Sequence, residues 1–318
     1  MQRLRLAFCL FAYRPYGGLQ RDFYRIAQVC AGRGHSIDVY TKEWQGAMPE
    51  NFNVHVLPAR GLRNHVRNRN FVRLVAGEIK AQKYDVVIGF NRMPGLDIYY
   101  AADPCYAARI KELHGPLYRL TARFRHSAVM ERAVFSPDSD AHILLISEKE
   151  LPRFTAHYNT PRERFRVLPP GIARDRQAPP DALRIRESFR KEFNLNEHDR
   201  LVLMVGSGFR TKGLDRAIRA LAALPDELRV RTRLMVVGDD KERPFRKLAG
   251  RLGAEGRVLF MQGQPDVTRF MLGADLLIHP AYSENTGTVL LEAIIAGLPV
   301  LATDVCGYAF HIERAQAG

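Results

Sequence analysis

At 318 residues, the chain is long for a single hydrophobic core, which favours two domains of about 150 residues each. Its 46% hydrophobic and 26% charged residues are typical of a folded globular protein and exclude the disordered and fibrous classes. The net charge of +14 suits an anionic partner, and nucleic acid, a membrane face and a phosphorylated substrate all satisfy that requirement.

The four cysteines are scattered and form no C-x-x-C pair, so reduced thiols in a cytosolic protein are the simplest interpretation. The first apolar run, residues 6–13, is too short to span a membrane and lacks a signal-peptide cleavage site. We interpret it as a buried strand that leads into a glycine turn. We therefore expect a protein without a membrane span, which is still able to lie against a membrane.

In the first half of the chain, short apolar runs alternate with helical patterns. We expect a helix over residues 19–33 and strands over residues 4–10, 36–40, 54–57, 86–90 and 143–146. Such alternation is typical of parallel strands with helices on both faces. Proline pairs at 169–170 and 179–180 then indicate a linker over residues 169–182.

The alternation restarts after this linker. Helices are expected over residues 214–224, 242–252 and 288–296, and strands over residues 201–205, 234–237, 258–260, 276–279 and 299–302. The sequence thus predicts an α/β fold with two doubly wound, Rossmann-like domains, over residues 1–168 and 183–318. Because ligands of such sheets bind at the carboxyl ends of the strands, we expect the domains to face each other across a cleft that holds the site.

Two loops that follow predicted strands carry glycines and cations. Gly17 and Gly18 precede the first helix, where they would let the chain turn tightly and expose amides to an anion; a plain turn is the alternative. Arg210 and Lys212 lie in the loop GSGFRTKG and would neutralise a leaving diphosphate; a solvated basic loop is the alternative. Neither loop has the full G-x-G-x-x-G pattern of dinucleotide-binding enzymes.

The segment PAYSENTGTVLLE, residues 280–292, holds the strongest motif. Gly287 is expected to open the helix over residues 288–296, so that the amides of Asn285, Thr286 and Gly287 would face a diphosphate. Glu292 follows Glu284 by eight residues and lies in an otherwise apolar stretch. A carboxylate there needs a partner, which is either a cation in a structural ion pair or the hydroxyls of a ligand such as a ribose.

These residues carry a resemblance to a known family. The E-x7-E spacing, the R-x-K-G loop and the GG loop resemble those of the retaining GT-B glycosyltransferases of group 1, the glycogen-synthase-like family. Within it, PYGGLQRDFYRIA, GFNRMPGLDIYYAAD, KGLDRAI and LLEAIIAGLPVL are similar to enzymes that build the lipopolysaccharide core. The resemblance covers essentially the whole chain. It implies UDP-glucose as donor and an inner-core heptose of lipopolysaccharide as acceptor, with retention and without a metal or other cofactor.

The resemblance also assigns roles to residues. It implies that Gly17 and Gly18 lie beside the donor phosphates, and that Lys212 and Arg176 bind the diphosphate, with Arg210 displaced by one position from the family pattern. Glu284 would bind glucose hydroxyls, Glu292 the ribose and Gln264 the uracil, while Asp22 and Asp103 would contact the acceptor and the sugar. We expect Glu284, Lys212 and Asp103 to be the catalytic residues. The resemblance further implies that the second domain is truncated at Gly318.

Residues 109–132 contain six basic and two acidic residues, with Leu117, Leu120, Phe124, Ala128 and Val129 at helical spacing. They predict a basic amphipathic helix, which either packs on its own domain or lies on an anionic membrane. Because the implied acceptor is a lipid, we expect it to lie on the cytoplasmic face of the inner membrane, as part of a peripheral protein. Residues 60–73 add five arginines, which would receive acceptor phosphates.

Asp138-Ser139-Asp140 is a literal D-x-D, but it precedes a predicted strand, whereas a metal-binding pair follows one; we interpret it as a surface turn. No RNA-binding motif is present, and we expect no nucleic-acid partner. Two alternatives to the glycosyltransferase stay open on the residues alone. One is a UDP-sugar epimerase or hydrolase on the same fold, and the other is a non-catalytic membrane-binding or RNA-binding module.

Overall fold

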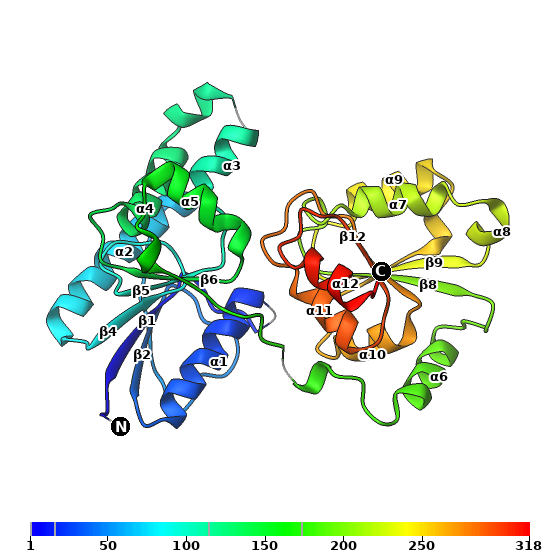
Figure 1. Cartoon of the computed structure of the whole chain (residues 1–318), viewed down its shortest axis with the longest axis horizontal. Coiled ribbons are helices and arrows are strands. Elements are labelled where there is room, and N and C mark those ends of the chain that lie inside the picture. Colours follow the sequence, from blue (N-terminus) through cyan, green and yellow to red (C-terminus); the bar gives the residue numbers. More distant parts are fainter. Residues whose placement is uncertain (1, 16, 114, 173) are drawn as a thin grey trace. The chain divides into compact units, whose positions relative to one another are not determined.

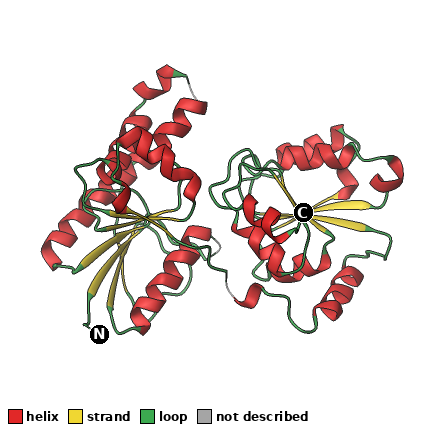
Figure 2. Ribbon diagram, in the orientation of Figure 1, coloured by secondary structure: helices red, strands yellow, loops and turns green. Residues whose placement is uncertain are grey.

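The structure is a computed structural model that describes residues 2–15, 17–113, 115–172 and 174–318. The chain divides into two compact units at the peptide bond between Pro169 and Pro170. Each unit is a parallel sheet with helices on both faces (Figures 1 and 2). Residues 170–182, which the sequence predicts as a linker, are grouped with the second unit.

The sheet of the first unit has seven strands in the order β3-β2-β1-β4-β5-β6-β7, and its neighbouring strands are parallel. The strands are β1 (Arg5–Cys9), β2 (Ser36–Thr41), β3 (Asn53–Val56), β4 (Val86–Gly89), β5 (Ile98–Ala101), β6 (His142–Leu145) and β7 (Phe165–Val167). The sequence analysis missed β5 and β7. Strand β7 is a three-residue edge strand with only one buried residue, whereas β5 does carry an apolar run, IYYA, which sequence reasoning overlooked.

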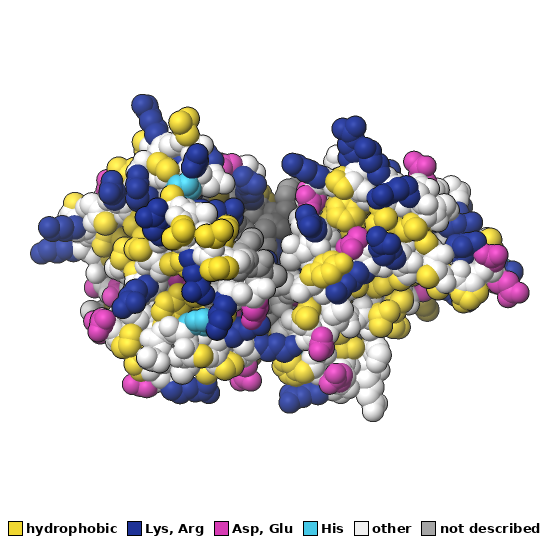
Figure 3. All heavy atoms as spheres, turned by 90° about the horizontal axis from the view of Figure 1, so that it is seen from above, with side chains coloured by type: hydrophobic (Ala, Val, Ile, Leu, Met, Phe, Trp, Pro, Cys, Tyr) yellow, Lys and Arg dark blue, Asp and Glu magenta, His cyan; other side chains and the backbone are white. Residues whose placement is uncertain are grey.

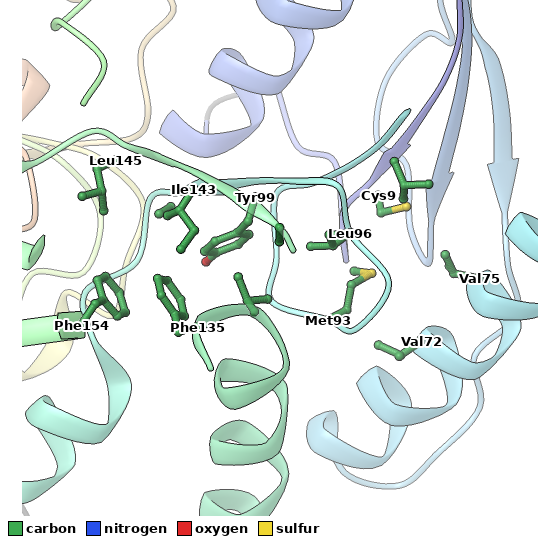
Figure 4. Close-up of a cluster of buried hydrophobic side chains, with 14 of the residues drawn as sticks. Cys9, Val72, Val75, Met93, Leu96, Tyr99, Phe135, Ile143, Leu145 and Phe154 are labelled. Atoms are coloured by element: carbon green, nitrogen blue, oxygen red, sulfur yellow. The ribbon is translucent and has the colours of Figure 1, made fainter. Parts of the chain in front are cut away.

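The helices of the first unit cover the sheet unevenly. Phe23 and Ala27 of α1 (Gly18–Gly32) pack against one face. Side chains of α2 (Asn64–Gln82), α3 (Tyr106–Leu113), α4 (Ala122–Phe135) and α5 (Leu151–Tyr158) pack against the other. Figure 4 shows this second cluster, in which the rings of Phe135 and Phe154 stack with their centroids 3.8 Å apart.

The predicted amphipathic helix over residues 109–132 is wrong as a single element. The chain forms α3, then the 3-10 helix η1 (Pro116–Leu120), and then α4. Gly115 and Pro116 end the first helix, because proline has no amide proton to continue it. Thr121 then starts α4 by accepting a hydrogen bond from the Phe124 amide at 3.1 Å. Instead of forming one buried stripe, Leu117, Leu120 and Val129 are 77%, 70% and 59% exposed.

The second unit has a five-stranded parallel sheet in the order β10-β9-β8-β11-β12. Its strands are β8 (Arg200–Val205), β9 (Thr232–Val237), β10 (Val258–Met261), β11 (Leu276–His279) and β12 (Val300–Ala302). One face packs against α7 (Leu214–Ala222) and α9 (Arg243–Arg251). The other packs against α6 (Ala182–Glu192), α10 (Val267–Gly273), α11 (Thr288–Ile295) and α12 (Ala309–Ala315). The prediction of two doubly wound α/β domains is confirmed.

Within the described residues, none of the helices combines the length and the apolarity that crossing a bilayer requires. In the face that Figure 3 shows, Lys and Arg side chains are spread over both units. Charge alone therefore does not locate a binding surface.

Candidate functional site

Two loops at the carboxyl edge of the second sheet are packed against each other. One loop, residues 206–213, follows β8, and the other, residues 280–287, follows β11. The amide of Tyr282 donates a hydrogen bond to the Thr211 carbonyl at 2.9 Å. Gly213 has a φ of +77°, and a Cβ there would lie 2.0 Å from the carbonyl oxygen of Pro280. Only glycine fits that contact, which holds the neighbouring Lys212 beside the second loop.

Lys212, Glu284 and His279 form a charged cluster where these loops meet. The Lys212 ammonium contacts the Oε2 atom of Glu284, and His279 Nε2 lies 3.3 Å from the same oxygen. The Glu284 side chain is only 11% exposed, and His279 is fully buried. The sequence analysis predicted Lys212 and Glu284 as site residues, and the structure brings the two together.

Burial sets the protonation states of the two basic groups in this cluster. It lowers the pKa of His279 to about 4, with a smaller contribution from the charge of Lys212, so the imidazole is neutral at pH 7. Burial also lowers the pKa of the Lys212 ammonium below its ordinary value. The cluster thus presents one cation and one carboxylate, with a neutral imidazole behind them. Such a set can bind an anionic phosphate and a sugar hydroxyl side by side.

Helix α11 starts where the sequence predicts. Gly287 precedes it with a φ of +83°, and its carbonyl accepts the amide of Leu290 at 2.9 Å. The preceding carbonyl, that of Thr286, accepts the amide of Tyr308 at 2.8 Å, which ties the loop to the start of α12. Asn285 lies half-buried in the same loop. The backbone from Asn285 to Gly287 is therefore held at the amino end of a helix, where an anion is favoured.

Glu292 has a cation next to it. It lies on α11 with 6% exposure, and its Oε1 atom is 3.9 Å from Nε of Arg176, in the 3-10 helix η4 (Arg174–Arg176). Of the two partners that the sequence analysis considered for Glu292, the structure shows the cation. The pair joins the proline-flanked segment 169–180 to the helix that begins at the proposed phosphate site.

Arg210 and Gln264 are less constrained. Arg210 is exposed in the turn before Lys212, and its guanidinium forms no ion pair with any residue that the structure describes. Gln264 is half-buried in the loop after β10. The Asp239 carboxylate fixes this loop by accepting a hydrogen bond from the amide of Gly263 at 3.0 Å. The backbone amide of Asp239 in turn donates a hydrogen bond to Ser207 Oγ at 3.2 Å.

In the first unit, Gly17 and Gly18 lie at the start of α1. Gly17 has a φ of −80°, which any residue can adopt, so its backbone conformation does not require glycine. A Cβ on Gly17 would meet only the flexible end of Gln20, and no described atom lies within 4 Å of one on Gly18. Contacts within the described chain therefore do not explain why glycine occupies positions 17 and 18. Tyr16, which precedes it in the motif, lies outside the described residues.

Asp22 lies on α1 and accepts a hydrogen bond from the hydroxyl of Tyr100, in β5, at 2.8 Å. Burial raises the pKa of Asp22, and the bond from Tyr100 opposes that rise. A half-buried carboxylate with a raised pKa accepts a proton more readily than a solvated one.

Asp103 is exposed on the loop after β5, and this loop is held from behind. Arg92, in the loop after β4, donates hydrogen bonds to the carbonyls of Asp103 at 3.1 Å and Pro104 at 2.6 Å. The same guanidinium forms an ion pair with the buried carboxylate of Glu131 at 2.9 Å. Glu131 also accepts hydrogen bonds from the amides of Tyr106 and Ala107 and from the hydroxyl of Tyr158.

Sequence reasoning missed His279, Tyr100, Arg92 and Glu131. His279 had a signal, because it is the polar residue that ends the apolar strand LLIH directly before the predicted site. Glu131 had one too, since it lies in the largely apolar stretch SAVMERAVF, as Glu292 lies in another. Asp138 and Asp140 follow α4 in a turn, and the described part of the chain contains no group of three potential metal ligands.

Comparison with known proteins adds the following. Residues 16–176 match the family model for Glycosyltransferase Family 4, and residues 185–318 match that for Glycosyl transferases group 1. The lipopolysaccharide glucosyltransferase WaaG of Escherichia coli (strain K12) is 49% identical over 313 residues, which are 98% of this chain and 84% of that protein.

Solved structures agree with these matches. The crystal structure of WaaG, a glycosyltransferase involved in lipopolysaccharide biosynthesis, superimposes with a TM-score of 0.94 at 48% identity, covering 98% of this chain and 84% of that one. Anabaena Alr3699/HepE, solved in complex with UDP-glucose, has a TM-score of 0.72 at 19% identity, covering 98% and 83%. The latter likeness shows a shared fold.

Proposed function

This chain belongs to the group 1 glycosyltransferase family and is a hexosyltransferase, and we propose that it transfers glucose from UDP-glucose to an inner-core heptose of lipopolysaccharide with retention. The observation that carries the proposal is the cluster of Lys212, Glu284 and His279 at the carboxyl edge of the second sheet, in a chain 49% identical to a lipopolysaccharide glucosyltransferase. Membership in an enzyme family sets aside the non-catalytic alternative.

On the donor side, the largest charge to be stabilised is that of UDP as the sugar–phosphate bond breaks. We assign the diphosphate to Lys212, to the amides from Asn285 to Gly287 and, more peripherally, to Arg210. Glu284 would accept hydrogen bonds from glucose hydroxyls, while the neutral His279 keeps that carboxylate in place. In this assignment cations and amides neutralise the leaving group, so the transfer needs no metal ion.

The nucleoside is assigned to the surrounding residues of the second unit. Glu292 would bind the ribose diol, and Arg176 would hold that carboxylate or share its charge with the diphosphate. Gln264 would face the uracil from the loop that Asp239 fixes. Burial of Glu292 supports this role, because a shielded carboxylate binds hydroxyl donors more strongly than a solvated one.

On the acceptor side, the candidates are Asp22 and Asp103 in the first unit, whereas the resemblance assigns Gly17 and Gly18 to the donor phosphates. The raised pKa of Asp22 suits a group that accepts a hydrogen bond, or the proton, from the attacking heptose hydroxyl. Asp103 is held for a similar contact by the bonds from Arg92 to its loop. In a retaining transfer, the acceptor oxygen ends on the face of glucose from which UDP left.

Residues 109–132 are the proposed membrane contact of a peripheral protein on the cytoplasmic face of the inner membrane. Leu117 and Leu120 are exposed next to Arg119 and Arg123, which suits insertion into an anionic surface even though the segment is not one helix. Replacing both leucines with serine should lower co-sedimentation with anionic vesicles about tenfold. The Leu183→Ser variant, with a 78% exposed leucine in the second unit, is the control. Equal binding by all three proteins would contradict the assignment.

Product analysis tests the proposed reaction. Purified protein would be incubated with UDP-glucose, with and without lipopolysaccharide that ends at the inner-core heptose. We expect glucose on the heptose, with the anomeric configuration of the donor, and release of UDP only when acceptor is present. Equally rapid consumption of UDP-glucose without acceptor would instead support the epimerase or hydrolase alternative.

A further inference from the structure

Lys42 lies at the carboxyl edge of the first sheet, in the residue directly after β2. Its ammonium donates a hydrogen bond to Asn68 Oδ1 of α2 at 2.5 Å and lies 4.7 Å from the centroid of the Phe11 ring. These contacts leave the side chain half-buried. Lys42 is not among the residues that the proposed reaction uses.

The position of this ammonium is well defined by the surrounding backbone. The amide of Lys42 donates to the carbonyl of Phe11 at 3.2 Å, and the amide of Phe11 donates to Asn91 Oδ1 at 2.7 Å. These bonds join the loops that follow β2, β1 and β4. The Phe11 ring packs edge-on against Phe71 of α2 at 5.8 Å. Lys42 thus lies beside the β1–β4 pair, where the strand order reverses and ligands of doubly wound sheets bind.

Apart from the adjacent Glu43, the charge that acts on Lys42 is of its own sign, that of Arg67. Within the described parts of the chain, no carboxylate forms an ion pair with Lys42, and the adjacent Glu43 pairs with Arg14 at 3.6 Å. Residues 51–77 contain five arginines and no Asp or Glu. Burial and the nearby charge of Arg67 lower the pKa of Lys42, and the charge of Glu43 opposes that change. Because Lys42 is half-buried and forms no ion pair with a described carboxylate, an anion that binds there would stabilise its charge.

We propose that Lys42, with Arg67 beside it, binds an anionic group of the acceptor, either a phosphoryl or a carboxylate group of the sugar chain. This inference rests on the proposed function and adds an acceptor-specificity site to it. The ammonium has donors beyond the one that Asn68 uses, and an anion contacted by both Lys42 and Arg67 would gain charge-assisted hydrogen bonds. In the proposed reaction the donor diphosphate is assigned to another cation, Lys212 in the second unit.

The test compares variants on acceptors with and without the anion. The acceptors are deacylated, heptose-terminated core oligosaccharide in three forms: untreated, dephosphorylated with hydrogen fluoride, and carboxyl-reduced. The variants are Lys42→Gln, which can still bond to Asn68, and Lys42→Arg, which keeps the charge. Lys80→Gln is the control, because Lys80 is an exposed lysine in the last turn of the same helix α2. Thermal unfolding checks that each variant is folded.

For Lys42→Gln we expect the acceptor KM on untreated oligosaccharide to rise about tenfold or more, with kcat and the KM for UDP-glucose within about twofold of wild type. On the form that lacks the recognised anion, wild type and Lys42→Gln should have equal KM values. Whichever treatment removes the difference identifies the anion. Lys42→Arg should restore most of the affinity, and Lys80→Gln should behave as wild type.

Several results would overturn the inference. One is an equal loss on all three forms, and another is a rise in the KM for UDP-glucose. A third is a loss that appears only when anionic vesicles are added, which would assign Lys42 to lipid headgroups. Calorimetric binding of untreated oligosaccharide separates this inference from the proposed function. Binding that depends on Lys42 without any glucose transfer would preserve the anion site and refute the reaction, whereas no binding to wild type would refute both.

Discussion

In the second unit, Lys212 and Glu284 meet at the carboxyl edge of the sheet, so the cation and the carboxylate form an ion pair. At the same edge of the first unit, Asp22 faces the neutral hydroxyl of Tyr100, and Lys42 faces an amide. Paired charges suit a ligand that carries both hydroxyls and phosphates. Charges that form no ion pair with a described residue respond more strongly to a ligand of the other sign. The comparison therefore predicts that donor-side variants lose turnover and acceptor-side variants lose affinity.

The Glu284→Ala variant should show the largest effect. Without this carboxylate, Lys212 loses its partner and glucose loses a hydrogen-bond acceptor, so we expect kcat to fall about 10² to 10³-fold. Initial rates of transfer to heptose-terminated lipopolysaccharide provide the measurement. Glu313→Ala, at an exposed glutamate of α12, should leave the rate unchanged. A Glu284→Ala enzyme with wild-type turnover would show that the cluster is structural only.

The Glu131→Gln variant tests whether the first unit depends on its buried charges. Arg92 would be left without its carboxylate in the interior, which should lower the free energy of unfolding by about 3–5 kcal/mol. The loop that carries Asp103 should loosen, and the acceptor KM should rise more than the donor KM. Urea unfolding and steady-state kinetics would measure the two effects. If the Arg92→Met/Glu131→Gln double variant is no more stable than Glu131→Gln, the ion pair is not the cause.

The Gly213→Ala variant tests the contact that positions Lys212. The new Cβ would meet the Pro280 carbonyl and would occupy a left-handed backbone conformation, so we expect a loss of about 1–3 kcal/mol in unfolding free energy. Weaker UDP-glucose binding should accompany it. Gly256→Ala is the matched control, since no described atom lies within 4 Å of a Cβ there. Equal melting temperatures for the two variants would mean that the loops shift without cost.

The smallest effect concerns pH. His279 binds a proton in the unfolded chain near its ordinary pKa of 6.5, but in the folded protein only near 4. Its contribution to stability is therefore full above pH 6.5 and is lost as the pH falls towards 4, by about 2 kcal/mol between pH 7 and pH 5. Urea unfolding at both pH values should show that the free energy of unfolding falls less for His279→Gln than for wild type. Identical losses would mean that His279 is not buried as a neutral group.

The alternation of apolar runs and helical patterns was enough to predict both sheets apart from β5 and β7, because a parallel strand buried on both faces leaves a continuous apolar run in the sequence. The start of α11 after Gly287 was equally local, since a left-handed residue before a helix favours glycine. The family resemblance followed from such short motifs and is confirmed by the relatives. The assigned roles of the site residues remain predictions.

Tertiary structure alone decided which groups meet. Lys212 contacts Glu284 where Gly213 packs against Pro280. Arg92, in the loop after β4, forms its ion pair with Glu131 of α4. The break of residues 109–132 into α3, η1 and α4 had a local cause instead, because Gly115 and Pro116 interrupt the helical pattern. The local pattern of apolar and polar residues indicates which side of each segment is buried. A contact between distant residues depends on the packing of whole elements, for which a single sequence carries no local signal.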